Sequence, residues 1–247
     1  MNLKTLLAKI GRRLARLAIH VFPGASRLLA PRERPEEIFT AIYRMNSWGS
    51  RESVSGPGST ADQTRLVTHR LPELFRDLGV QSILDLPCGD FNWIRGVDLG
   101  GIDYLGADIV PDIVERNTKL HQADGIRFER MNLLEDPLPR VDLVLCRDCL
   151  VHFSSEDVFR ALENICSSGS KYLLSTTCPD RRRNRAIFTG EWQPINLQTH
   201  PFLLPKPDPL FNEGCTESGG RFTGKSLGLW AIPAIRKALD ASRPSRR

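Results

Sequence analysis

Several features that would place this chain in other protein classes are missing from its sequence. It has no internal repeat, no low-complexity tract and no signal-peptide cleavage pattern, so we expect reduced thiols in a cytoplasmic protein. Of its six cysteines, only Cys146 and Cys149 form a Cys-x-x-Cys pair, and no second pair stands at a zinc-binding spacing. We therefore expect no metal site. The pair is either redox-active or, as the apolar run before Cys146 favours, buried and structural.

Acidic residues are missing from the first 32 positions, which carry seven Lys or Arg. Residues 232–247 have a net charge of +4, so subtracting both ends from the formal total of +5 leaves −6 for residues 33–231. A nucleic-acid-binding protein would carry its positive charge on the folded face. This distribution argues against a nucleic-acid partner.

The apolar residues near the N-terminus form no run long enough to span a bilayer. They recur instead at helical spacing, with Lys and Arg between them, which predicts a basic amphipathic helix within residues 1–30. Such a helix makes peripheral contact with an anionic membrane through residues 1–21, or it packs on its own domain or on a partner subunit. We expect residues 31–59 to form a linker and an N-terminal lid.

From residue 60 onward, short apolar runs alternate with helical patterns. Strands are predicted over 82–86, 103–108, 126–129, 141–146 and 171–177, and helices over 60–78, 111–120 and 154–166. Nearly continuous apolar strands are typical of a parallel sheet that is covered on both faces. We predict one α/β domain over residues 60–235, with a Rossmann-like, mostly parallel sheet, helices on both faces and a late edge strand over 227–230. A basic tail is expected over 236–247.

The most informative motif is Ile83-Leu84-Asp85-Leu86-Pro87-Cys88-Gly89-Asp90-Phe91-Asn92-Trp93. An apolar strand ends in an acid and then turns through Gly89, which lets the backbone approach a ligand closely. A carboxylate at this turn suits a cationic group better than a phosphate. The run resembles the first motif of class I S-adenosylmethionine (SAM)-dependent methyltransferases, with Pro87 and Phe91 where glycine is common. It is most similar to that of a mainly bacterial subgroup, and the resemblance extends from about residue 39 to 230.

The resemblance implies that SAM is the cofactor and that residues at successive strand ends bind it. Asp108 stands 23 residues after Asp85, where the superfamily has an acid that hydrogen-bonds the ribose hydroxyls of the cofactor. Ile109 would pack on adenine, and Asn132 would accept a bond from its amino group. Taken alone, Gly89 or Asn132 would be a turn residue and Asp108 a helix N-cap. The full set of expected cofactor residues is Asp85, Pro87, Cys88, Gly89, Asp90, Asp108, Ile109, Asn132 and Arg147.

The segment after the fourth predicted strand holds the candidate catalytic residues. In the superfamily this segment lines the methionine end of the cofactor and the acceptor site. We assign His152 as a general base and Asp148 as its orienting group or a cofactor contact. The alternative is that His152 merely caps the helix that follows. The Asn/Asp-Pro-Pro-Tyr/Phe motif of enzymes that methylate amide or adenine nitrogen is absent, which favours oxygen as the acceptor atom.

Two irregular segments are predicted to bind the acceptor. Tyr43 and Trp48 lie in the N-terminal lid, and residues 179–215 form a long, arginine- and proline-rich, lid-like insertion of the kind that is usually functional. Aromatic walls with amide donors suit a sugar, and the arginines suit a phosphate or carboxylate; the alternative is an exposed basic loop. The expected acceptor-binding residues are Tyr43, Trp48, Trp93, Asn184, Trp192, Asn196 and His200, with Phe202 as a further wall residue.

These expectations define a methyltransferase that acts on a small-molecule or glycan-type acceptor. A nucleotide-sugar or NAD-dependent oxidoreductase would need Gly-x-Gly-x-x-Gly and a Tyr-x-x-x-Lys pair, and neither occurs. A non-catalytic cofactor-binding scaffold would lose the polar acceptor wall, which this chain keeps. A nucleic-acid methyltransferase is the third alternative and would bind RNA with strong salt dependence. The sequence does not indicate an oligomeric state.

Overall fold

The computed structural model describes residues 34–242, and the predicted N-terminal amphipathic helix lies outside this range. Six helices in the described chain are α3 (Pro35–Arg44), α4 (Ala61–Leu78), α5 (Pro111–His121), α6 (Ser155–Ser167), α7 (Glu217–Gly220) and α8 (Ile232–Ser242). The strands are β1 (Ser82–Asp85), β2 (Asp103–Asp108), β3 (Ile126–Arg130), β4 (Leu143–Cys146), β5 (Tyr172–Thr177), β6 (Leu210–Asn212) and β7 (Ser226–Ala231). Within residues 34–242, no helix is long and apolar enough to cross a membrane.

The seven strands form one mixed sheet in the order β3-β2-β1-β4-β5-β7-β6. The first five are parallel, whereas β7 runs antiparallel to both β5 and β6. The predicted α/β, Rossmann-like, mostly parallel architecture is therefore confirmed. The strand order reverses between β1 and β4, so the carboxyl ends of these neighbours border a crevice.

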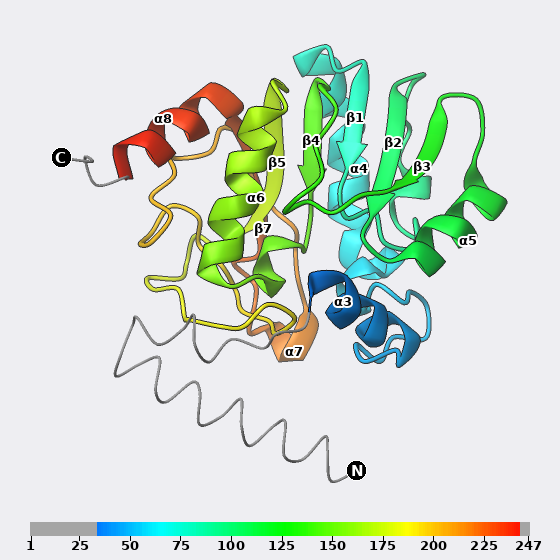
Figure 1. Cartoon of the computed structure of the whole chain (residues 1–247), viewed down its shortest axis with the longest axis horizontal. Coiled ribbons are helices and arrows are strands. Elements are labelled where there is room, and N and C mark those ends of the chain that lie inside the picture. The colour runs from blue at the N-terminus through cyan, green and yellow to red at the C-terminus, as the bar shows by residue number, and fades with distance from the viewer. Residues whose placement is uncertain (1–33, 243–247) are drawn as a thin grey trace, which may run out of the picture.

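Alternating side chains of the central strands fill two separate cores, one on each face of the sheet. Ile83, Leu143 and Leu145 pack on the α4 side, with Leu71 and Phe75 of that helix. Leu84, Val144 and Cys146 pack on the opposite side, together with apolar residues of α6 and α8. Figure 1 shows α6 and α8 in front of the sheet and α4 behind it. Because both faces are buried, these strands have no polar face in their sequences, which is why they were recognisable.

The last part of the chain departs from the predicted boundaries. The strand over 227–230 is not an edge strand, because β7 lies between β5 and β6 and the missed strand β6 occupies the edge. The domain does not end at residue 235, since α8 continues to Ser242 and buries Leu239 against the α6 side. Residues 236–242 therefore belong to the domain and not to a basic tail. At the other end, α3 occupies part of the predicted linker.

Candidate active site

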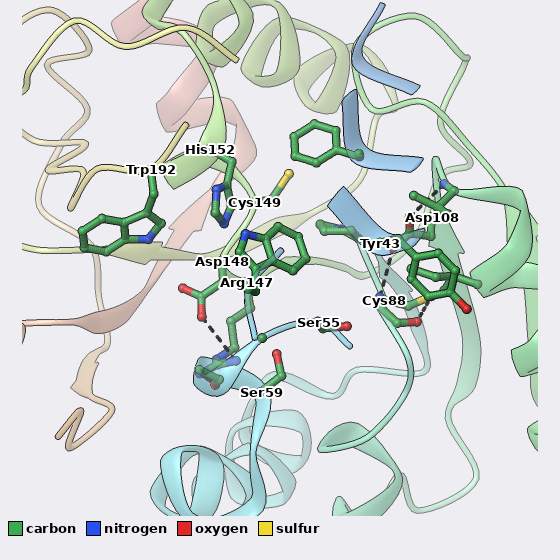
Figure 2. A pocket seen from close by; sticks show the side chains of 18 of the residues that line it. Tyr43, Ser55, Ser59, Cys88, Asp108, Arg147, Asp148, Cys149, His152 and Trp192 are labelled. Atoms are coloured by element: carbon green, nitrogen blue, oxygen red, sulfur yellow. Dashed lines mark hydrogen bonds and ion pairs between the residues drawn. The ribbon is translucent and has the colours of Figure 1, made fainter. Parts of the chain in front are cut away.

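A cavity of about 440 Å³ opens at the carboxyl edge of the sheet, where the strand order reverses. Its size falls in the range of about 300–1,000 Å³ that is usual for small-molecule sites. Figure 2 shows its walls. They come from the turn after β1 (87–89), the end of β2 (108–110), the loop after β4 (147–149 and 152), α3 with the turn that follows it (39, 43, 47 and 48), and the segment before β7 (217, 218, 222 and 225).

The turn after β1 is held against an N-terminal strap, which we define as residues 50–59. Gly89 has a φ of +55°, and a Cβ at this position would lie 2.2 Å from Ser55 Oγ. Glycine is required both for the left-handed backbone and for the close approach. Asp90 does not line the cavity, contrary to the prediction. Its carboxylate accepts hydrogen bonds from Ser53 Oγ and Val54 N, both at 2.9 Å, so it fastens the strap to this turn.

The two acids at the strand ends have different surroundings. Asp108 lines the cavity, and its carboxylate accepts hydrogen bonds from Gly89 N at 3.2 Å and from Val110 N at 2.9 Å. Burial raises the pKa of Asp108 to about 6, so the group is mostly ionised at neutral pH. Val110, not Asp108, is the N-cap of α5. Asp108 is therefore an ionised carboxylate in the cavity wall, at the end of β2.

Asp85 is buried beneath the turn and is absent from the cavity wall, which corrects its predicted role as a direct cofactor contact. Its carboxyl group accepts a hydrogen bond from Tyr104 Oη at 2.6 Å. Burial raises the pKa of Asp85 to about 7, more than the bond from Tyr104 lowers it. The strand places this side chain on the α4 side of the sheet, where Tyr104 of β2 also lies. Asp85 therefore ties β1 to β2 instead of facing the cavity.

The remaining predicted cofactor residues do line the cavity. They are Pro87, Cys88, Ile109, Asn132 and Arg147. Asn132 Oδ1 accepts a bond from Leu134 N at 3.0 Å, so this side chain also closes a turn, as the simpler interpretation of it expected. Burial raises the pKa of the Cys88 thiol well above its usual value, which makes this cysteine a wall residue and not a nucleophile.

A buried cluster of charges lies at the part of the cavity wall that is formed by the loop after β4 and the segment before β7. Lys225 Nζ lies 2.5 Å from Asp148 Oδ2 and 3.5 Å from Glu213 Oε2. Arg147 lies 2.6 Å from Glu213 and also donates to Gly58 O of the strap at 2.8 Å. The side chains of Arg147, Glu213 and Lys225 are at most 7% exposed, so their charges interact with little screening by water. The cluster joins the strap to the loop after β4 and to the segment before β7.

The charge cluster fixes the ionisation of Asp148. Burial raises the pKa of this carboxyl group, but Lys225 and Arg147 outweigh it and lower the pKa to about 2. Asp148 has a φ of +52°, an uncommon value for a residue with a side chain, and its N–H donates to Thr176 Oγ1 at 2.8 Å. Asp148 is thus a permanent carboxylate in a constrained position at the cavity wall.

His152 reaches the cavity from the short turn that precedes α6. Its Nδ1 lies 3.0 Å from the carbonyl oxygen of Glu191, and because a carbonyl can only accept, Nδ1 carries the proton. Nε2 is then unprotonated, and it has no hydrogen-bond partner within residues 34–242. Burial lowers the pKa of His152, so the ring is neutral at physiological pH. The helix cap is Ser154, whose side chain accepts from Asp157 N, so the capping alternative for His152 is not what the fold uses.

Aromatic side chains form the rest of this end of the cavity. The ring of Trp48 lies 5.2 Å from that of His152, and Phe39 contacts the same histidine edge-on at 6.4 Å. Trp192 packs on Phe222 with their centroids 4.6 Å apart. Tyr43 and Trp93, which the sequence predicts to bind the acceptor, also line the cavity. The walls are thus flat and apolar around one neutral imidazole.

Four residues that the sequence predicts at the acceptor site lie elsewhere. Asn184 Nδ2 donates to Asn196 O at 2.9 Å, and Asn196 Nδ2 donates to Arg181 O at 2.8 Å, so both amides stabilise their own segment. His200 is exposed and outside the cavity. Phe202 is fully buried in the core on the α6 side. Of the predicted insertion 179–215, only Trp192 lines the cavity, because most of its apolar residues pack into the domain.

The comparisons with known proteins identify the fold. A scan against models of known families finds no match, and no curated protein matches the sequence. Human N-acetylserotonin methyltransferase, solved in complex with SAM, matches 81% of this chain at 19% identity with a TM-score of 0.51, and the match spans 59% of the human chain. Magnesium protoporphyrin IX methyltransferase from Synechocystis, solved with bound SAM, matches 81% of this chain and 97% of its own at 13% identity, also with a TM-score of 0.51. This chain has the class I methyltransferase fold.

Within this methyltransferase fold, several site residues escaped sequence reasoning. Lys225, Phe222 and Glu217 come from a segment with no recognisable motif, and Phe39 lies on α3, within the range that the sequence predicts to be a linker. The only available signal was Lys225 itself, a charged residue immediately before the apolar run of β7. Such a position is typical of a strand end near a ligand, but the antiparallel direction of β7 had to be known to place it at this edge.

Proposed function

We propose that this protein transfers a methyl group from SAM to an oxygen atom of a small-molecule acceptor, with His152 as the general base. One observation carries the proposal: a single cavity contains the strand-end carboxylate of Asp108 and a neutral histidine with a free Nε2. The first is suited to a ribosyl group and the second to a hydroxyl group. The motif around Gly89, which resembles that of a mainly bacterial subgroup of the superfamily, supports the proposal.

The residues of the cavity fit SAM at its nucleoside end. Asp108 offers a carboxylate to ribose hydroxyls, and Ile109 and Leu133 offer an apolar surface to adenine, with Asn132 beside them. At the other end, Asp85 and Asp90 are engaged elsewhere, so Ser55, Ser59 and Arg147 are the polar groups at hand for the amino-acid moiety. Bound SAM would supply an electrophilic methyl group on a sulfonium centre.

His152 performs the acid–base work in the proposed reaction. With Nδ1 donating to Glu191 O, the ring is fixed in the tautomer that accepts a proton at Nε2. The permanent carboxylate of Asp148 favours the imidazolium that forms when the hydroxyl proton moves to Nε2. General-base assistance of this kind contributes about 100-fold or more to a rate.

The aromatic walls orient the acceptor and exclude water. Trp48 offers a flat surface next to the His152 ring, and the Trp192–Phe222 pair offers a second one in the same cavity. A displacement at a methyl group depends strongly on alignment, so such walls contribute through positioning. The glycan form of the acceptor loses its main support, because the amide donors of Asn184 and Asn196 bond their own backbone. We therefore propose a flat small molecule that carries a hydroxyl group.

The test of this function is calorimetric titration of the purified chain with SAM and S-adenosylhomocysteine, with NAD and a nucleotide-sugar as controls. Saturable binding of the first two alone, followed by methyl uptake from labelled SAM into hydroxylated aromatic compounds, would support the proposal. If the chain binds neither compound, SAM is not its cofactor, and the alternative of a non-catalytic scaffold protein with this fold is favoured. Binding without transfer to any hydroxyl compound would remove oxygen as the acceptor atom.

A further inference from the structure

Several arginines surround the outer aromatic wall of the cavity. Arg181 lies with its guanidinium carbon 5.8 Å from the centre of the Phe222 ring and donates to Arg221 O at 2.7 Å. On the other side, the backbone N–H of Arg185 donates at 2.8 Å to the side chain of Gln193, the neighbour of Trp192. Arg181 thus lies against the Phe222 ring, Arg221 directly precedes Phe222 in the chain, and the backbone of Arg185 contacts the residue that follows Trp192. We call Arg181, Arg185 and Arg221 the arginine rim.

Two of the three rim arginines have no acidic partner in the described part of the chain. The side chains of Arg185 and Arg221 are exposed and have no hydrogen bond or ion pair with any residue of the described range 34–242. Arg181 has one weak ion pair, at 3.6 Å from Asp180. Arginine at a solvent-exposed position without a carboxylate partner is free to bind an anion through paired N–H groups.

The interior of the cavity has the opposite character. Lys225 and Arg147 are its two cations, and each lies within 4.0 Å of at least two carboxylates of the charge cluster. Counting Asp148, Glu213 and Glu217 against these two cations, the cluster carries a net charge of −1. The cluster therefore gives an anionic group of the acceptor no net attraction beside His152, whereas the rim arginines would attract it.

We propose that the acceptor carries a phosphate group, which the arginine rim holds outside the Trp192–Phe222 wall while the uncharged hydroxylated end reaches His152. Several unpaired arginines fit a group with two or more negative charges, such as a phosphate monoester or pyrophosphate; a single carboxylate would leave most of them unpaired. This inference rests on the proposed function, because it concerns the acceptor of that reaction.

The experiment is titration of the full chain with inorganic pyrophosphate, followed by calorimetry. The wild type is expected to bind saturably, and Arg181→Gln with Arg185→Gln to weaken binding by about tenfold or more. Arg116→Gln is the matched control, since Arg116 is an exposed arginine of α5, at the far side of the sheet from the rim in Figure 1. If the double variant fails to fold, Arg185→Gln alone is measured instead, because its side chain makes no hydrogen bond or ion pair within the described chain.

The proposed phosphate site would be wrong if the wild type and the rim variants bound pyrophosphate equally well. It would also be wrong if Arg116→Gln weakened pyrophosphate binding as much as the rim variants do. The absence of saturable binding by the wild type would contradict it as well. Vesicles of anionic or zwitterionic phospholipid then distinguish the two sources of the phosphate. If anionic vesicles compete with pyrophosphate for the wild type but not for the rim variants, the phosphate belongs to a lipid. If they do not compete, the acceptor is a soluble phosphorylated molecule. Because none of these measurements involves SAM, loss of the proposed function would show separately, as missing SAM binding with the pyrophosphate site intact.

Discussion

His152 donates its Nδ1 proton to the backbone carbonyl of Glu191, across a distance of 3.0 Å, and thereby leaves Nε2 as the accepting nitrogen in the cavity. Glu191 lies 39 residues further along the chain, in the segment that also carries Trp192. This one contact therefore fixes the tautomer of His152 and joins the histidine to the segment that carries Trp192. The tautomer follows from a main-chain group, which no side-chain substitution at position 191 removes.

Replacing the base tests this arrangement. His152→Ala is expected to lower kcat by about 100-fold or more and to leave SAM affinity within about twofold, because Nε2 acts on the acceptor alone. The matched control is His69→Ala, an exposed histidine on α4 outside the cavity. In wild type, since burial lowers the pKa of His152, the rate should stay constant through neutral pH and fall only below the usual histidine pKa of 6.5. Full activity of His152→Ala would remove the assignment.

Substitutions of the two strand-end acids, Asp108 and Asp85, should affect SAM affinity differently. Asp108→Asn is expected to weaken SAM binding by about tenfold or more, because the neutral amide replaces the charged acceptor that faces the cavity. Asp85→Asn should leave the affinity within a few-fold, because its side chain contacts Tyr104 beneath the turn. Calorimetry on both isosteric variants measures this. The opposite ranking would mean that Asp85, not Asp108, contacts the cofactor.

Asp85 should also determine part of the pH dependence of stability. Its folded pKa of about 7 lies above the usual aspartate pKa of 3.8, so the folded state binds the proton more tightly, and this contribution to stability is lost as pH rises from about 4 to 7. Asp85→Asn should therefore gain stability over wild type across that window, by at most roughly 4 kcal/mol above pH 7. Urea unfolding at several pH values, with the exposed Asp62→Asn as control, gives the difference. A pH-independent difference would contradict the burial of an ionising carboxyl group.

The charge cluster should contribute more stability than a surface ion pair of similar length. Lys225→Met leaves Asp148 and Glu213 as buried carboxylates with one cation, and is expected to cost about 3–5 kcal/mol. Lys171→Met breaks the pair with Asp142, where the lysine is 58% exposed, and should cost about 0–1 kcal/mol. Urea unfolding of the two variants at neutral pH compares them directly. Similar costs would mean that water screens the cluster.

The contact between Gly89 and the strap gives a prediction with an internal reference. Gly79→Ala places a Cβ at a φ of +62° with no atom within 4 Å, so it measures the left-handed backbone alone, roughly 1–2 kcal/mol. Gly89→Ala adds the clash with Ser55 Oγ and should cost more in thermal unfolding. Ser55→Gly in the Gly89→Ala background should restore part of the difference. Equal costs for the two glycines would show that the strap does not lie against the turn.

The central sheet was predictable from sequence because its signal is local. The strand over 103–108 has the predicted boundaries, and those of β1, β3, β4 and β5 differ by at most two residues at either end. Strands β1, β2, β4 and β5 are buried on both faces, so their apolar runs stand out from their neighbours, whereas the edge strand β3 buries only Phe128. By contrast, β6 contributes only three residues with exposed or half-exposed side chains, so it has no distinctive pattern. Helix α3 begins with Pro35 followed by Glu36 and Glu37, which is a helix-start signal, but it buries no residue and was not predicted.

The sequence by itself determined the fold class and the acids and glycine at the strand ends, because parallel strands bring their carboxyl ends to one edge wherever their helices lie. Only the tertiary structure decided which of those groups face the cavity. Asp85 and Asp108 both end strands, yet Asp85 is hydrogen-bonded to Tyr104 beneath the turn, whereas Asp108 lines the cavity. Likewise, Lys225 meets Asp148 across 77 residues, and Arg147 meets Gly58 across 89. Contacts over such separations depend on the packing of whole elements, and no spacing in the chain encodes them.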